Sequence, residues 1–251
     1  MLIDSHCHLD LLEDADGALT RARAAGVEHV ITIGVDLATS EDAIRRAHDD
    51  PGISATVGLH PHDAKDWTPQ LWDRITELAA DPRCVGVGEA GLDYHYDHSP
   101  RATQRAVFER HVELAASSGK RLVIHTRDAW DDTWAILEAG VPEMPVFHCF
   151  SGSQLEVERG LELGAIFSYS GVVTFKNAEA LRAAALVTPL GSLIVETDAP
   201  FLAPVPHRGR PCEPAMVLDT LRFIAELKQI APEELAESTR ETTKRVFGLT
   251  D

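Results

Sequence analysis

Short apolar runs alternate with longer amphipathic segments along the whole chain. The apolar runs are rich in Val, Ile and Leu, which is typical of buried strands, and the segments between them have helical length and spacing. Strands are predicted at residues 1–9, 29–35, 53–60, 84–90, 121–126, 145–150, 165–171 and 193–198. Helices are expected after each strand, for example at Thr103–Ser118 and Asp128–Ala139, with two more at Ala215–Lys228 and Pro232–Phe247.

Eight strand–helix units predict an α/β protein with the (β/α)8 TIM-barrel fold rather than an open doubly wound sheet. No strand is followed by GxGxxG or GxxxxGK[ST], so the usual nucleotide-fold signals are absent from the sequence. No linker-like or low-complexity segment divides the 251 residues. We therefore expect one barrel domain over residues 1–251.

The amino-acid composition limits the class of protein and the compartment in which it is expected. An apolar fraction of 44% is enough for a sizeable core. No apolar run approaches the ~20 residues that span a bilayer, and no secretory signal is visible, so we expect a cytoplasmic protein with no membrane partner. The four cysteines are scattered without a CxxC pair, which disfavours a disulfide framework or a zinc–thiolate site.

The formal net charge of −17 argues against a broad basic surface for duplex DNA. It does not exclude a phosphorylated substrate, because bound metal cations can supply positive charge locally. No obligate protein partner is indicated.

Polar residues gather where the predicted strands end. In a barrel these ends converge on one mouth, which carries the active site. Any one of them could be a strand-end residue bonded to a loop, but a core has no packing reason to collect four imidazoles and two carboxylates. Together they predict a set of metal ligands: His6, His8, Glu89, His125, His148 and Asp198.

The spacing of the first pair supports this set. On a strand, His6 and His8 point to one face and Cys7 to the other, whereas on a helix the two histidines would diverge by about 200°. Cys149 directly follows His148 and is expected to turn away in the same manner. Both cysteines are therefore interpreted as small buried residues and not as ligands.

Six ligands exceed what one tetrahedral zinc with an open position needs. They suit two divalent cations ~3.5–4 Å apart, with Glu89 as the natural bridging ligand. Nitrogen and carboxylate donors leave Zn²⁺, Mn²⁺, Mg²⁺ and Co²⁺ open.

The segments around these residues are more specific. They read DSHCHLD, GLHPH, GEAGLDYHYDHSP, QRAVFERHVELA, VIHTRDA, FHCFSGS and ETDAPFLAPVPHRGRPCEPA. In this order, over essentially the whole chain, they resemble the TatD family of metal-dependent deoxyribonucleases, which are amidohydrolase-like metal hydrolases. The resemblance implies the same six ligands. One departure is Cys212 in RPCEP, where many members carry Asn, and it leaves a loop or substrate contact open.

The resemblance also implies phosphodiester hydrolysis, commonly 3′-to-5′ exonuclease action on single-stranded DNA or 3′ ends. Two cations suit this chemistry because they lower the pKa of a shared water toward ~7 and neutralise phosphoryl oxygens. Asp198 is the candidate general base as well as a ligand, and Glu89 is the second catalytic candidate.

Positive or imidazole side chains on the expected mouth loops are candidate contacts for a substrate phosphate. Solvated loop charges are the alternative interpretation for each, and His62 is expected at the rim or in a structural role. The candidates are His60, Arg127, His207 and Arg208.

Two acids share a strand face with ligands. Asp4 and Glu196 lie two residues before His6 and Asp198, so strand alternation turns them the same way, and we expect them to orient ligand imidazoles. Asp93 could serve the mouth or cap a turn.

Two other functions stay open. A metal-dependent deacylase or amidohydrolase, acting for example on aminoacyl-tRNA, would use the same scaffold, and fold alone does not choose. No Lys stands at a strand end to form the carbamylated bridge of many amide hydrolases. A non-catalytic metal-binding protein would have no need of basic mouth residues or of an inward base.

Overall fold

The computed structural model describes residues 1–140 and 142–250. Its strands form one eight-stranded sheet, hydrogen bonded in sequence order from β1 to β8. The strands are β1 Leu2–Cys7, β2 Val27–Ile33, β3 Ile53–Val57, β4 Cys84–Asp93, β5 Arg121–Arg127, β6 Val146–Phe147, β7 Ile166–Tyr169 and β8 Leu193–Val195.

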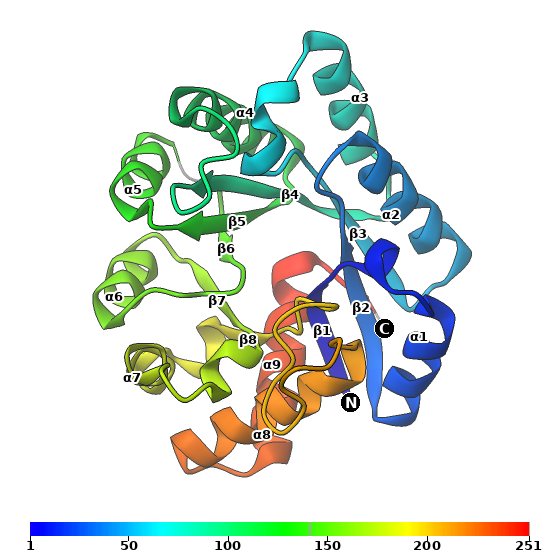
Figure 1. Cartoon of the computed structure of the whole chain (residues 1–251), viewed down its shortest axis with the longest axis vertical. Helices are drawn as coiled ribbons and strands as arrows, with labels where there is room; N and C mark the ends of the chain where they lie inside the picture. The colour runs from blue at the N-terminus through cyan, green and yellow to red at the C-terminus, as the bar shows by residue number, and fades with distance from the viewer. Residues whose placement is uncertain (141, 251) are drawn as a thin grey trace. The chain divides into compact units, whose positions relative to one another are not determined.

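Helices alternate with these strands, and a further helix follows at the end of the chain (Figure 1). They are α1 Ala15–Ala24, α2 Leu37–Asp49, α3 Pro69–Ala79, α4 Arg101–Ser118, α5 Trp130–Ala139, α6 Gln154–Glu162, α7 Glu179–Val187, α8 Val217–Lys228 and α9 Pro232–Phe247. Parallel strands in sequence order with alternating helices are the (β/α)8 arrangement, which confirms the predicted fold class.

Six of the eight strands end two or three residues earlier than predicted, and β6 and β8 are among them. β6 ends at Phe147 and β8 at Val195, so His148 and Asp198 lie beyond the strands in which they were predicted. Cys149 and Asp198 have positive φ angles of 40° and 57°, and this left-handed backbone cannot continue a strand. The chain therefore turns at the point where His148 and Asp198 stand.

The chain divides into two compact units, Met1–Thr32 with His148–Asp251, and Ile33–Phe147. The single barrel domain expected over the whole chain stays a prediction.

In the Ile33–Phe147 unit, helices α2 to α5 lie along the outer side of the strands (Figure 1). The central pairing is between β4 and β5, for example Val87 with Leu122. Helix α2 begins with a capping box between Asp36 and Thr39, which satisfies backbone N–H groups of its first turn.

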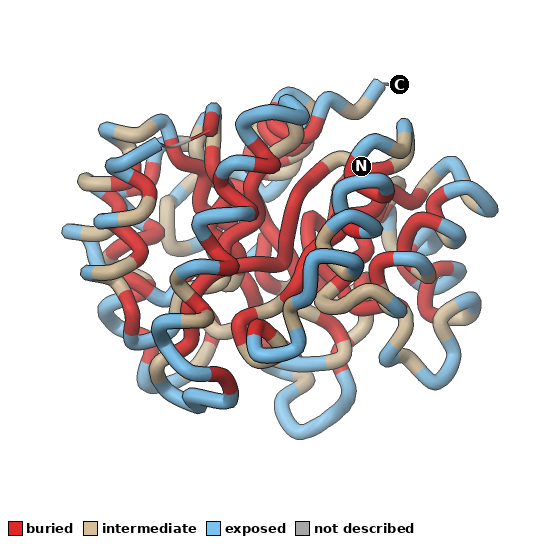
Figure 2. Tube along the Cα trace, turned by 90° about the horizontal axis from the view of Figure 1, so that it is seen from above, coloured by how far each residue is buried: buried red, intermediate tan, exposed pale blue. Residues whose placement is uncertain are grey.

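In the other unit, the last helix packs on the first strand. Helix α9 contacts β1 and β8, and it buries Leu235, Val246 and Phe247 on one face. Helix α8 packs against α9 in turn. Figure 2 shows strands buried along their length and helices that alternate between buried and exposed positions.

Within the part of the chain that the structure describes, no helix combines the length and the apolar character that a membrane crossing requires.

Candidate metal-binding clusters

The Met1–Thr32 and His148–Asp251 unit brings together three of the predicted ligands, His6, His8 and Asp198, named here the His–Asp cluster. Asp198 Oδ1 lies 3.3 Å from His8 Nε2 and 3.7 Å from His6 Nε2. Both imidazoles are buried. Two imidazole nitrogens that converge on one carboxylate oxygen in a buried site fit a divalent cation.

Backbone pairing holds this cluster. The N–H of His8 donates to Ala199 O at 2.8 Å, and the N–H of Asp198 donates to His6 O at 2.9 Å. These two bonds join the end of β1 to the segment after β8. Together with the positive φ of Asp198, they bring its carboxylate to the two imidazoles.

Asp198 is an anion at neutral pH. Burial raises the pKa of its carboxyl, but the hydrogen bond with His8 and the nearby imidazoles of His148 and His6 outweigh burial and lower that pKa below its ordinary value. A deprotonated carboxylate can ligate a cation or accept a proton.

His148 lies against the same cluster. Its ring stacks on the His6 ring with centroids 3.9 Å apart, and its Nδ1 lies 3.4 Å from Glu196 Oε1. The same Glu196 oxygen accepts the Cys149 N–H at 2.7 Å. Glu196 therefore stands where the sequence predicted an orienting carboxylate.

Asp4 does not orient an imidazole, which corrects the prediction for this residue. Its carboxyl group instead accepts the Thr197 N–H at 2.9 Å and the Thr197 hydroxyl at 2.6 Å, with a weaker contact from the His6 N–H at 3.4 Å. Burial raises the pKa of Asp4 to about 8. Asp4 thus fixes the backbone that leads to Asp198.

The Ile33–Phe147 unit forms a second group, His60, Glu89 and His125, named here the His–Glu cluster. Glu89 Oε1 lies 2.9 Å from His125 Nδ1 and 3.3 Å from His60 Nε2. Burial lowers the pKa of His60 to about 4, so its ring is neutral at pH 7 and has a lone pair to offer.

Glycines make this cluster possible. Gly88 and Gly91 of β4 have φ angles of 134° and 147°. A Cβ at Gly88 would lie 2.3 Å from Val123 O, and one at Gly91 would lie 1.9 Å from His125 O. Only glycine permits this approach of β4 to β5, which sets Glu89 beside His125.

His60 was predicted as a substrate contact and was left out of the ligand set. The structure places it among ligand atoms. The signal was present in the sequence, since His60 follows a predicted strand as the other candidates do.

The remaining predicted substrate contacts have partners within their own units. His207 Nε2 lies 3.1 Å from Asp219 Oδ2 of α8, and the Arg208 guanidinium lies 3.7 Å from the centroid of the Phe175 ring. The Arg127 guanidinium lies 4.8 Å from the centroid of the Tyr96 ring, whose residue is 51% exposed. Their roles toward a substrate stay predictions.

The cysteines do not join the clusters found among the described residues. Cys7 is buried with its Sγ 3.7 Å from Ile31 O, and burial raises the pKa of its thiol well above the usual value. Cys212 is also buried, and its N–H donates to Pro200 O. Cys149 is only half-buried, contrary to the prediction, because it stands in the turn after β6 and not on the strand.

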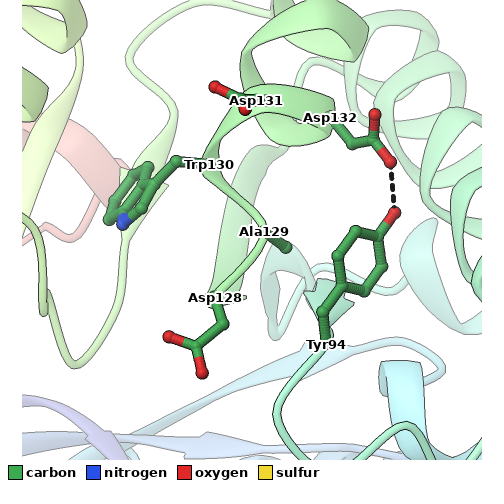
Figure 3. Close-up of a pocket in the computed structure, with 6 residues that line it drawn as sticks. All are labelled: Tyr94, Asp128, Ala129, Trp130, Asp131 and Asp132. Atoms are coloured by element: carbon green, nitrogen blue, oxygen red, sulfur yellow. Dashed lines mark hydrogen bonds between the residues drawn. The ribbon is translucent and has the colours of Figure 1, made fainter.

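An open pocket of about 430 Å³ lies beside Tyr94 and the start of α5 (Figure 3). Its lining includes Asp128, Asp131 and Asp132, and the Tyr94 hydroxyl donates to Asp132. None of the predicted ligands lines it, and three carboxylates do not suit a phosphate. Each of the two clusters remains a candidate site in its own unit.

A (β/α)8 fold that carries clusters of imidazoles and carboxylates in and after its strands is typical of metal-dependent hydrolases. The chain belongs to the family described as TatD related DNase, whose model matches residues 3–248.

Relatives agree with this membership. The chain is 39% identical to the metal-dependent hydrolase YcfH of Escherichia coli K12, over 99% of this chain and 96% of the relative. It is 35% identical to the 3′-5′ ssDNA/RNA exonuclease TatD of Klebsiella pneumoniae, over 94% of this chain and 92% of the relative. The crystal structure of YjjV, a TatD homologue from E. coli K12, superposes with a TM-score of 0.94 at 27% identity, covering 99% of this chain and 98% of YjjV.

Proposed function

We propose that this hydrolase removes nucleotides from the 3′ end of single-stranded nucleic acid. The observation that carries the proposal is the presence of two clusters, one in each unit, each with imidazole and carboxylate donors. Relatives 34–35% identical to the chain bear the name 3′-5′ ssDNA/RNA exonuclease TatD, which supports this substrate class.

Each cluster would hold one divalent cation. His6, His8 and Asp198 supply the donors of one, and His60, Glu89 and His125 those of the other. The Nδ1 of His148 lies 3.4 Å from Glu196 Oε1, and His148 as a ligand stays a prediction. Bridging of the two cations by Glu89 stays a prediction.

Bound cations would lower the pKa of the attacking water and neutralise phosphoryl oxygens. The Asp198 carboxylate accepts the proton of this water as the new P–O bond forms. It then returns the proton to the leaving 3′ oxygen as the scissile P–O bond breaks. A base of this kind contributes ~10²–10⁴-fold.

The test uses the full chain stripped of metal and reloaded with Mn²⁺, Mg²⁺, Zn²⁺ or Co²⁺ in turn. A 5′-labelled single-stranded oligonucleotide with a free 3′ end should give a ladder of shortened products, and the same oligonucleotide with a blocked 3′ end should stay intact. Simple esters and aminoacyl-tRNA are assayed in parallel. Ester or aminoacyl-tRNA cleavage without nucleic-acid degradation under every metal would overturn the proposal in favour of a deacylase.

A cytoplasmic location and the lack of an obligate protein partner stay predictions.

A further inference from the structure

Asp93, the last residue of β4, is fully buried and contacts two histidines. Its Oδ2 lies 3.0 Å from His62 Nε2 and 3.1 Å from His125 Nε2. Its Oδ1 accepts the N–H groups of His95 and Tyr96 at 3.0 and 2.8 Å. The Asp93 carboxylate thus contacts the loops that follow β3 and β4 and also the side chain of His125 in β5.

The contact with His125 determines which ring nitrogen can bind a cation. An ionised carboxylate only accepts hydrogen bonds, so the Nε2 that faces Asp93 must carry a hydrogen. In a neutral imidazole the other nitrogen then holds the lone pair. That nitrogen is Nδ1, which lies 2.9 Å from Glu89 Oε1 and so faces a second carboxylate at hydrogen-bond distance. A cation held by Glu89 would take the place of a hydrogen at Nδ1, whereas Asp93 belongs to none of the candidate metal clusters among the described residues and keeps the hydrogen at Nε2.

Asp93 is itself firmly placed. Its backbone N–H donates to Gln104 Oε1 at 2.8 Å, and Gln104 Nε2 donates to the Asp93 carbonyl at 3.1 Å. Gln104 is a fully buried residue of α4, and its Nε2 also donates to Ser99 O. The carboxylate therefore has little freedom to follow a displaced imidazole.

We propose that Asp93 is a positioning residue that fixes the ring orientation and the proton of His125, so that Nδ1 is its metal-binding atom. This inference rests on the proposed metal site of the His–Glu cluster. Carboxylates that hold a ligand histidine by its second nitrogen typically account for 10–100-fold in metal affinity.

If Asp93 only capped the turn after β4, one of its two carboxylate oxygens would be enough. The bonds from His95 and Tyr96 go to Oδ1, and an Asn side chain would keep this oxygen. The contacts with the two imidazoles go to Oδ2, which Asn replaces with an amide that donates hydrogen bonds. Asp93→Asn therefore keeps the cap and forces the hydrogen of His125 toward Nδ1, where it blocks ligation.

Metal binding is measured for the wild-type chain, Asp93→Asn and Glu89→Ala by equilibrium dialysis with ICP mass spectrometry and by chelator competition. Asp128→Asn is the matched control, because it removes a neighbouring charge that is 70% exposed and contacts His95 at 3.2 Å. We expect Asp93→Asn to bind metal at one site about 10–100-fold more weakly, while the metal-free protein stays folded and binding at the other site stays as in the wild type. Asp128→Asn should match the wild type throughout.

Wild-type affinity in Asp93→Asn would overturn the inference and leave the proposed site standing. Unchanged metal content in Glu89→Ala would instead overturn the site itself.

A second measurement needs no variant. In the zinc-loaded wild type, ¹⁵N NMR should show His125 protonated at Nε2 and metal-bound at Nδ1. Metal bound to Nε2 would refute the inference. Because this measurement uses the wild type, it decides the question even if Asp93→Asn does not fold.

Discussion

The candidate ligands of the two clusters are held in position by different kinds of contact. The His–Asp cluster is held mainly through backbone, since His8 and Asp198 are joined across β1 and the segment after β8, and Asp4 bonds to the Thr197 backbone and hydroxyl. The His–Glu cluster is held through side chains, with Asp93 contacting His125 directly. Replacing Asp93 by Asn should therefore harm the His–Glu cluster, whereas replacing Asp4 by Asn should spare the His–Asp cluster.

The largest expected effect comes from Glu89→Ala. This change removes the carboxylate that both imidazoles of the His–Glu cluster face, so the cation and the activity should be lost together. Metal content and nuclease rate of the same preparation are the measurement. A variant that keeps full metal content but has no activity would contradict the assignment of Glu89 as a ligand.

Next comes Asp198→Asn in the His–Asp cluster. The amide cannot accept the proton of the attacking water, so kcat should fall by ~10²–10⁴-fold. Glu89 and its two imidazoles are untouched, so at least one cation should stay bound, as metal analysis would show. Wild-type turnover would refute Asp198 as the base.

Gly91→Ala tests the close approach of β4 and β5. The new Cβ would overlap His125 O at a φ of 147°, and we expect a loss of about 3 kcal/mol in the free energy of unfolding. Urea unfolding of the metal-free protein measures it.

Gly119→Ala is the control for this change. Gly119 has a φ of 69° at the end of α4, and its added Cβ would meet nothing within 4 Å. It should cost only about 1 kcal/mol, for the left-handed backbone alone. Equal losses in the two variants would mean that the overlap at His125 is unimportant.

The smallest effect on metal is expected from Asp4→Asn, because the amide can keep the contacts to Thr197 and His6. Metal affinity should stay within about threefold of the wild type, in contrast to the 10–100-fold loss expected for Asp93→Asn. An equal loss in the two Asn variants would remove the contrast between the clusters.

The same variant should change the pH dependence of stability. The folded pKa of Asp4, about 8, lies above the ordinary 3.8, so the folded state binds the extra proton. The wild type therefore loses stability as pH rises from about 4 to about 8. The Asp4→Asn variant does not show this loss, because Asn has no proton to release in this range. Thermal unfolding of the metal-free proteins at pH 5 and pH 8.5 should favour Asp4→Asn increasingly at the higher pH.

Periodicity sufficed to predict the fold class, because each strand buries both faces and each helix only one. The predicted ligand set contains five of the six residues of the two clusters, all except His60. The role of these residues as metal ligands stays a prediction. The partner of each acid was less predictable. Strand alternation placed Asp4 on the same face as His6. Whether the Asp4 carboxyl contacts an imidazole or a backbone N–H depends on where the chain turns after β8.

Asp93 and His60 show the same limit. The role of Asp93 depends on the loops after β3 and β4 and on a side chain of β5, and no local pattern in GLDY predicts that these three come together. His60 ends a predicted strand, so it was recognisable as a candidate, but its place beside Glu89 depends on the folded course of β4.

The backbone bonds between β1 and the segment after β8 also set an order of events during synthesis. All donors of the His–Glu cluster have been translated once residue 125 is added, whereas the His–Asp cluster waits for residue 198. His6 and His8 are among the first residues made, yet their carboxylate partner is translated only when about four-fifths of the chain exists. The donors of one cluster are therefore all synthesised well before those of the other.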